Sequence, residues 1–222
     1  MYGLAGIVNI NKYRYELLHF ERRQEMAKGL IVAGFLVGIV LFALQGCTTL
    51  DGTKEAKEPE FVLRINCGAF EPYTDREGNV WLADQEMEPG KEWGAVGGVT
   101  VDWGDLEIAD TNSPRVYQTE RYNMDGYKFD LTTNGIYTIY LHFAETFYDI
   151  RAEGERVFSV IVNGRGFLED FDVFKAAGGF QKPVVAMIEG VKVIKGELTI
   201  DFTPNVQNPE INGIEILSEK LD

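Results

Sequence analysis

The feature that most constrains the fold is a series of short apolar runs, rich in β-branched and aromatic residues, that begins at residue 61. Turn-forming residues separate these runs at intervals of about ten residues, a spacing typical of β-sandwiches. No segment of this region shows a helical period of any length. The sequence therefore predicts an all-β domain, an antiparallel β-sandwich, over residues 61–218.

The clearest expected strand is residues 136–145, IYTIYLHFAE, in which alternate residues from Tyr137 to Phe143 share one face. Both faces are fairly apolar, so we predict a central strand that is covered on both sides, with His142 as a structural residue. Turns are expected at Asn134–Gly135, Asn163–Gly164 and Lys195–Gly196. The other expected strands are residues 61–67, 80–84, 115–119, 127–131, 156–163, 166–174, 184–189, 191–194, 197–202 and 211–217.

Three segments are expected to be loops, and the first of them is the polar stretch at residues 73–78. Residues 91–114 form the longest, which carries Trp93–Gly94 and Trp103–Gly104, and residues 204–209 form the last. Glycine lets a backbone bend and approach a neighbour closely, and loops carry function more often than strands do. Each tryptophan is therefore either a functional ring or an anchor that holds its loop in place.

The N-terminal region has the pattern of an export signal. Residues 29–44 are sixteen uncharged residues, short for a membrane span of about 20 residues but suited to a signal peptide. Five basic residues precede the run, and Leu44–Gln45–Gly46–Cys47 follows it and resembles a bacterial lipobox, whose cysteine is acylated and becomes the mature N-terminus. We expect residues 1–46 to be an export leader, with a true start possible at Met26, or else an uncleaved signal anchor.

Acylation of Cys47 predicts where the protein resides. Two or more acyl chains hold a protein stably on a bilayer, so we expect a lipoprotein of the bacterial cell envelope, on the periplasmic or extracellular face. Residues 47–60 combine the lipidated cysteine with a polar stretch, TTLDGTKEAKEPE, which is typical of a flexible tether.

Charge and cysteine content narrow the possible partners. The formal net charge of −14 argues against a nucleic-acid partner, because phosphate attracts clusters of Lys and Arg. Only two cysteines are present, and lipidation of Cys47 leaves Cys67 alone in an apolar strand. Cys67 is therefore predicted to be a small buried side chain, with no disulfide framework.

Between residues 117 and 148 lie six of the ten tyrosines, and motifs in and around this stretch resemble malectin and the malectin-like carbohydrate-binding domains. The resemblance covers roughly residues 61–217. It implies a jelly-roll-like, galactose-binding-domain-like sandwich that binds a short glucose-type saccharide without catalysis. The motifs that carry it are YQTERY at residues 117–122, FAE at 143–145 with Phe147–Tyr148, RVFSV at 156–160 with Asn163–Gly164, FDV at 171–173 and NGIEI at 212–216.

The resemblance also implies a set of ligand-contacting residues. Trp93 stands where the family has a tyrosine before glycine, Tyr122 matches the tyrosine after Glu-Arg, and Phe147–Tyr148 matches an adjacent aromatic pair. Gln207 replaces an aspartate before Asn-Pro, so a neutral amide stands where the family has a carboxylate. Flat rings with a few polar groups suit a pyranose, which has an apolar C–H face and a rim of hydroxyls.

No catalytic or cofactor motif accompanies these residues. The sequence has no nucleophile elbow, no HExxH and no phosphate-binding loop, so we expect a binding protein and not an enzyme. Nothing indicates a cofactor, although loop carboxylates leave a structural Ca²⁺ open. Two alternatives also stay open: a structural or protein-interaction module with a decayed sugar site, suggested by Gln207, and a targeting accessory of a glycoside hydrolase. Protein partners cannot be inferred from the sequence.

Overall fold

The computed structural model describes residues 6–9, 59 and 61–219. Several predicted features lie outside the described residues: the start at Met26, the apolar run, the predicted acylation site Cys47 and nearly all of the tether. The lipoprotein signal therefore stays a prediction. Among the residues that are described, no helix is long and apolar enough to cross a membrane.

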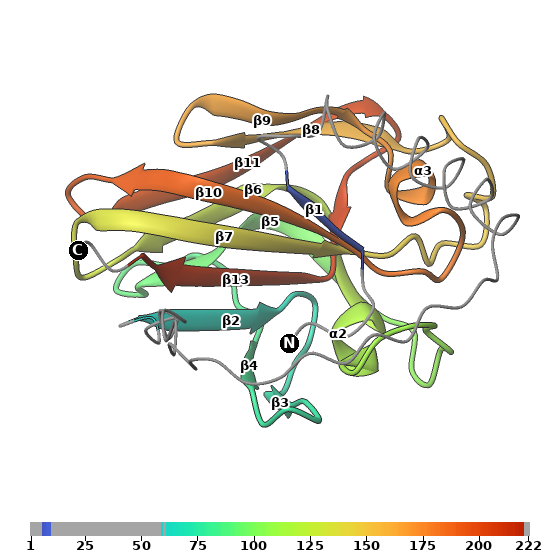
Figure 1. The fold of residues 1–222 in the computed structure, drawn as a ribbon, viewed down its shortest axis with the longest axis horizontal. Coiled ribbons are helices and arrows are strands. Elements are labelled where there is room, and N and C mark those ends of the chain that lie inside the picture. Colours follow the sequence, from blue (N-terminus) through green and yellow to red (C-terminus); the bar gives the residue numbers. More distant parts are fainter. Residues whose placement is uncertain (1–5, 10–58, 60, 220–222) are drawn as a thin grey trace, which may run out of the picture. The chain divides into compact units, whose positions relative to one another are not determined.

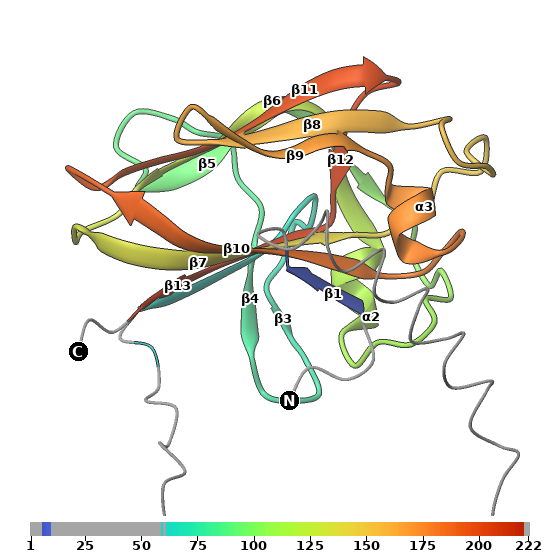
Figure 2. The same ribbon diagram turned by 45° about the horizontal axis from the view of Figure 1, so that its top comes forward.

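The domain is a sandwich of two sheets, as predicted (Figures 1 and 2). The seven-stranded sheet has the order β1 (Gly6–Asn9), β10 (Val184–Val193), β7 (Gly135–Phe143), β13 (Gly213–Ser218), β2 (Val62–Asn66), β4 (Val80–Ala83) and β3 (Tyr73–Thr74). The six-stranded sheet has the order β12 (Glu210–Ile211), β6 (Thr119–Asp130), β11 (Glu197–Val206), β8 (Val157–Val162) and β9 (Arg165–Phe171), with β5 (Trp93–Asp102) paired to β6. All strand pairs in the described residues are antiparallel except β1 with β10 and β2 with β4.

The core lies between the two sheets. Strand β7 is central in its sheet, between β10 and β13, and its alternate side chains from Tyr137 to Phe143 are almost completely buried. The ring of Phe143 packs against Phe158 of β8 and Phe171 of β9, at centroid distances of 5.8 and 5.1 Å. The period-two pattern therefore identified the inward face correctly. The opposite face of β7 is half-buried at most positions, so the expected cover on both sides is only partial.

The expected loop at residues 91–114 is wrong over much of its length, because residues 93–102 form the ten-residue strand β5. Its glycines allow close packing of backbones and do not break the strand. A Cβ on Gly94 would lie 2.4 Å from the backbone nitrogen of Met87, and one on Gly98 would lie 2.8 Å from the carbonyl oxygen of Tyr122. Only glycine fits such close approaches.

The expected strand at residues 115–119 is also wrong, because Pro114–Tyr117 forms the one-turn helix α2. Proline fits the first turn of a helix, and here it outweighs the strand preference of the residues that follow it. The expected strand at 166–174 ends at Phe171, and Val173–Ala177 is a second short helix, α3. Asp172 caps α3 through its side chain, and Gly178 ends it with a left-handed conformation.

Several strand boundaries differ from the expected ones. Strand β6 is longer than residues 127–131, and the two expected strands at 184–194 are one strand with a bulge between Ile188 and Val191. Strand β11 continues to Val206, so the last loop is shorter than predicted. The closing strand at 211–217 is divided between β12 and β13. None of these differences changes the order of the elements.

The two residues predicted to be structural are both buried. Cys67 is a free thiol with no exposed surface, and burial raises its pKa well above the ordinary value. His142 accepts or donates hydrogen bonds at both ring nitrogens, to the Tyr117 hydroxyl at 2.8 Å and to Glu215 at 2.9 Å. The ring centroids of His142 and Trp81 lie 5.2 Å apart in a T-shaped arrangement. These contacts are consistent with the predicted structural role of His142.

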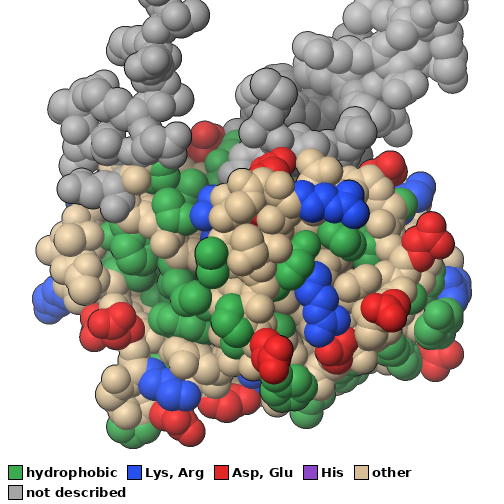
Figure 3. Space-filling model, turned by 90° about the horizontal axis from the view of Figure 1, so that it is seen from below, with side chains coloured by type: hydrophobic (Ala, Val, Ile, Leu, Met, Phe, Trp, Pro, Cys, Tyr) green, Lys and Arg blue, Asp and Glu red, His purple; other side chains and the backbone are tan. Residues whose placement is uncertain are grey.

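On one face of the domain, acidic side chains are scattered and do not form a single patch (Figure 3). Figure 3 shows the side on which β3 and β4 lie, with hydrophobic side chains in groups between scattered acidic and basic ones. Strand β4 contributes two exposed hydrophobic residues, Val80 and Leu82.

Candidate functional site

Two of the residues predicted to bind ligand meet directly. Tyr122 lies on β6, and Gln207 follows the end of β11, 85 residues further along the chain. The Tyr122 hydroxyl donates to Oε1 of Gln207 at 3.2 Å and accepts from Nδ2 of Asn208 at 3.1 Å. Pairing of β12 with β6, which sets Glu210 opposite Tyr122, brings the last loop to this position.

Gln207 adopts a backbone conformation that is uncommon for a residue with a side chain. Its φ is 61°, in the left-handed region, and such strain often marks a functional site. Its Oε1 accepts from the Asn208 backbone N–H at 3.1 Å as well as from Tyr122. Its side-chain Nε2 has no hydrogen-bond partner among residues 61–219, so this amide can donate to a ligand.

Phe147 and Tyr148 follow the end of β7 and leave part of each ring in solvent, with 37% and 56% of their surface exposed. The Phe147 backbone N–H donates to Glu145 at 3.0 Å. The Tyr148 ring packs against Phe180 at 5.7 Å, and the Arg151 guanidinium lies 3.5 Å from the Phe180 centroid and 5.0 Å from that of Tyr148.

Trp93 lies away from these residues. It begins β5 and pairs with Phe129, whereas Tyr122 pairs with Val99 further along the same two strands. Seven residues of strand separate Phe129 from Tyr122, which corresponds to roughly 20 Å. The proposal that Trp93 shares a site with Tyr122 is therefore not supported by its position.

Trp103, directly after β5, takes the place that was expected for Trp93. Its ring centroid lies 6.5 Å from that of Phe147, and its Nε1 donates to Glu120 at 3.2 Å. The sequence contained the signal that would have found it, because Trp103 also precedes a glycine. We call Trp103, Tyr122, Phe147, Tyr148 and Gln207 the aromatic cluster.

The buried carboxylate of Glu120 connects Trp103 with the loop after β7. Glu120 is 3% exposed and lies two residues before Tyr122, on the same face of β6. Its Oε2 accepts from Trp103 and also from the Thr146 hydroxyl at 2.7 Å. Glu120 therefore fixes the indole of Trp103 relative to the loop that carries Phe147.

A buried arginine connects three elements. Arg156 is 2% exposed and donates to Glu145 through Nε at 2.8 Å and Nη2 at 3.3 Å. Its Nη1 donates to the Asn208 carbonyl at 2.9 Å, and its guanidinium lies 5.4 Å from the Tyr122 ring centroid. Burial opposes the charge, but the Glu145 carboxylate raises the pKa of Arg156 above its ordinary value. Arg156 thus stays charged and fixes both loops against β6.

Glu210 lies beneath the aromatic cluster without a partner. It is fully buried, and neither carboxyl oxygen has a hydrogen-bond partner in the described part of the chain. Burial first, and then the nearby Glu120 carboxylate, raises the pKa of Glu210 well above its ordinary value, although Arg156 opposes the shift. Burial in this position therefore favours the protonated, neutral form of Glu210.

The arrangement can bind a ligand that has both apolar faces and hydroxyls. Half-exposed rings offer stacking surfaces, while the Gln207 amide and the tyrosine hydroxyls offer hydrogen bonds. Within the described residues, no group of three or more His, Cys, Asp or Glu side chains is arranged to hold a metal ion.

Comparisons with known proteins identify relatives of this domain. Receptor-like protein 4 of Arabidopsis thaliana is 38% identical over 92 residues, which cover 40% of this chain and 14% of that protein. Malectin-B of Xenopus laevis is 29% identical over 121 residues, which cover 48% of this chain and 43% of that protein. A crystal structure of Bacteroides uniformis β-glucuronidase has a TM-score of 0.65 at 27% identity, and the match covers 72% of this chain and 18% of that chain.

The chain spans less than half the length of these relatives, so their activities as whole proteins do not transfer to it. The family assignment rests on the domain alone. The model of the malectin domain matches residues 61–214, nearly all of the β-sandwich. The chain belongs to the malectin domain family, whose domains bind carbohydrate without catalysis.

Proposed function

We propose that this chain binds glucose-type oligosaccharides at the aromatic cluster and is held on a bacterial membrane by acylation of Cys47. The observation that supports the proposal is that two pairs of these residues meet, Trp103 with Phe147 and Tyr122 with Gln207. The buried side chains of Glu120 and Arg156 connect the segments that carry the two pairs.

The rings and the polar groups have different roles in recognition. Trp103, Phe147 and Tyr148 offer apolar surface for the C–H face of a pyranose. Tyr122 and Gln207 offer a hydroxyl and an amide for the sugar hydroxyls. Because Gln207 is neutral, its hydrogen bonds are weaker than those of a carboxylate, and we expect affinities weaker than a charged residue would give.

Non-catalytic binding is favoured by where the carboxylates lie. Hydrolysis of a glycosidic bond needs two carboxyl groups that flank the bond. The carboxyls beneath the cluster, those of Glu120, Glu145 and Glu210, are at most 3% exposed. Two of them are engaged in hydrogen bonds that fix the loops, and the third lies beneath the surface.

A second candidate role is that of a targeting accessory to a glycoside hydrolase. It is favoured by the likeness to a β-glucuronidase, of which the matched region is only 18%. In this role the domain would still bind saccharide, and a separate hydrolase would supply the chemistry.

The test is a binding screen of the full chain, kept in a detergent without a sugar headgroup, against glucose disaccharides of each linkage. We expect millimolar or tighter binding to at least one. Trp103→Ala should weaken it about tenfold, the loss of roughly 1.4 kcal/mol that one good stacking contact can supply. Trp93→Ala removes the same side chain outside the cluster and should leave binding unchanged. Failure to bind any disaccharide at millimolar concentration would refute the proposal, and release of reducing ends would indicate an enzyme instead.

A further inference from the structure

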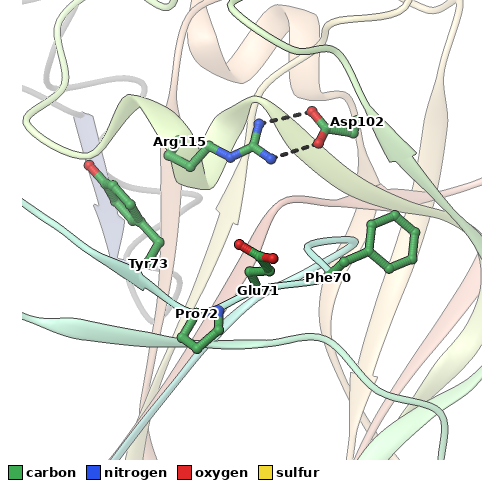
Figure 4. Close-up of a pocket in the computed structure, with 6 residues that line it drawn as sticks. All are labelled: Phe70, Glu71, Pro72, Tyr73, Asp102 and Arg115. Carbon is green, nitrogen blue, oxygen red and sulfur yellow. Dashed lines mark hydrogen bonds and ion pairs between the residues drawn. The ribbon is translucent and has the colours of Figure 1, made fainter.

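A pocket lies beside Asp102, the residue directly before Trp103. It has a volume of about 550 Å³ and is lined by Phe70, Glu71, Pro72, Tyr73, Asp102 and Arg115. Figure 4 shows Phe70 and Tyr73 on opposite sides, the Arg115–Asp102 pair above and Glu71 with Pro72 below. A pocket of this size accommodates a small ligand.

The most unusual wall of the pocket is Phe70, which leaves 76% of its surface in solvent. This exposed apolar ring is available to stack against a ligand. The loop that carries it is tightly held, because a Cβ on Gly68 would lie 2.1 Å from the Glu120 carbonyl oxygen. The Gly68 N–H also donates to Asp84 at 2.7 Å, and the Asp84 N–H donates to the Ala69 carbonyl at 2.8 Å. Phe70 is thus presented by a fixed backbone, which lowers the entropy lost on binding.

The polar wall is equally fixed. Arg115 of α2 donates to both carboxylate oxygens of Asp102, at 2.8 and 2.6 Å. The hydrogen bonds from Arg115 lower the pKa of Asp102 to about 2, so the pair stays ionised at neutral pH. Since the charges of this pair cancel, the Glu71 carboxylate leaves the pocket with a net negative charge. An anionic ligand is therefore disfavoured, and the carboxylate oxygens can accept hydrogen bonds from the hydroxyls of a neutral ligand.

The pocket and the aromatic cluster share one wall. Asp102 lines the pocket, and the next residue, Trp103, contacts the Phe147 ring at 6.5 Å. The Gly104 N–H donates to Asp102 at 2.9 Å and fixes the turn at this point. Because Asp102 and Trp103 are consecutive, the pocket begins next to the backbone that carries the Trp103 ring.

We propose that this pocket is a second saccharide subsite, which binds a further neutral pyranose of the oligosaccharide held at the aromatic cluster. Phe70 and Tyr73 supply the stacking faces, and the Asp102 and Glu71 carboxylates accept hydrogen bonds from sugar hydroxyls. The proposal rests on the function proposed above, and it predicts that the protein prefers oligosaccharides longer than a disaccharide.

The experiment measures affinity as a function of ligand length. The full chain, in a detergent without a sugar headgroup, is titrated calorimetrically with glucose oligomers of two to six units in the linkage that the disaccharide screen selects. Affinity should rise about fivefold to tenfold beyond the disaccharide, as one further stacked ring predicts. Phe70→Ala should abolish that rise and leave disaccharide affinity unchanged. Because Phe70 is exposed, its replacement leaves the fold intact.

Two controls make the result specific. Ile194→Ala truncates another exposed hydrophobic residue, in the turn between β10 and β11, and should keep the length dependence. Replacing the terminal glucose of the long oligomer by glucuronate should weaken binding, because Glu71 repels it. A disaccharide that binds without any gain on lengthening overturns the second subsite alone. Stronger binding of the glucuronate oligomer overturns the assignment to a neutral sugar, and absence of binding to every oligomer overturns both proposals.

Discussion

The buried ion pair between Arg156 and Glu145 allows the sharpest test of how the site is built. Replacing Arg156 by Met leaves the Glu145 carboxylate buried, with only the Phe147 N–H as a hydrogen-bond donor, and removes the contact to the Asn208 carbonyl. Loss of one partner from a buried pair costs about 3 to 5 kcal/mol. For a domain of about 160 residues, the unfolding entropy is about 0.34 kcal/mol/K, so Tm should fall by about 9 to 15 °C.

The assay is thermal unfolding followed by circular dichroism at pH 7, with the full chain and four variants: Arg156→Met, Glu145→Gln, the double variant and Arg151→Met. Arg151→Met, which removes an exposed arginine from the neighbouring loop, is the matched control and should lower Tm by no more than about 2 °C. The double variant Arg156→Met with Glu145→Gln leaves no unpaired buried charge, so it should recover at least about 2 kcal/mol relative to the sum of the single changes. A Tm loss below about 3 °C for Arg156→Met, or simple additivity in the double variant, would contradict the reasoning.

Three further predictions follow from named residues. Glu210→Gln should stabilise the protein at pH 7 and make its stability depend less on pH. The folded state keeps a proton on Glu210 that the unfolded state releases above about pH 4.3. The free energy of unfolding of the wild type therefore falls with rising pH by up to about 1.4 kcal/mol per pH unit. Urea unfolding between pH 5 and 8 measures this, and equal slopes for both proteins would count against it. Trp103→Ala should weaken disaccharide binding about tenfold, whereas Trp93→Ala should not, and the reverse order would restore the original assignment. Cys47→Ser should abolish incorporation of a fatty-acid analogue in bacteria that express the full chain, whereas Cys67→Ser should not; continued labelling of the first variant would exclude the predicted anchor.

The sheets themselves were predictable because their signal is local. Alternation from Tyr137 to Phe143 depends only on the two-residue period of a strand, and the inward face follows from it. Strand β5 was not predictable from composition, because its glycines lower strand propensity when read alone. Their role appears only when Gly94 and Gly98 are placed against Met87 and Tyr122. The strand conformation of β5 therefore depends on long-range packing, which a short window of sequence does not contain.

The candidate site also combines contacts that the sequence predicted with contacts that depend on tertiary structure. Tyr122 and Gln207 were predicted together, and the hydrogen bond between them is present. The choice between the two tryptophans depends instead on the register of β5 against β6, since both stand before glycine. That register shifts once, between Val96 and Gly97, and it places Trp93 opposite Phe129, away from Tyr122. The buried Arg156 was part of a recognised motif, but its contacts to two loops are purely tertiary.

Strand β1 bears on the predicted export signal. Gly6–Asn9 pairs in parallel with Val184–Met187 at the edge of the seven-stranded sheet, and it precedes the apolar run at residues 29–44. An export signal keeps the residues before its apolar run on the cytoplasmic side while the rest of the chain crosses. The pairing and the predicted export therefore exclude each other, because they put β1 and β10 on opposite sides of one membrane. In the exported form the edge of β10 has no β1 beside it, and its backbone N–H and C=O groups are open to another strand.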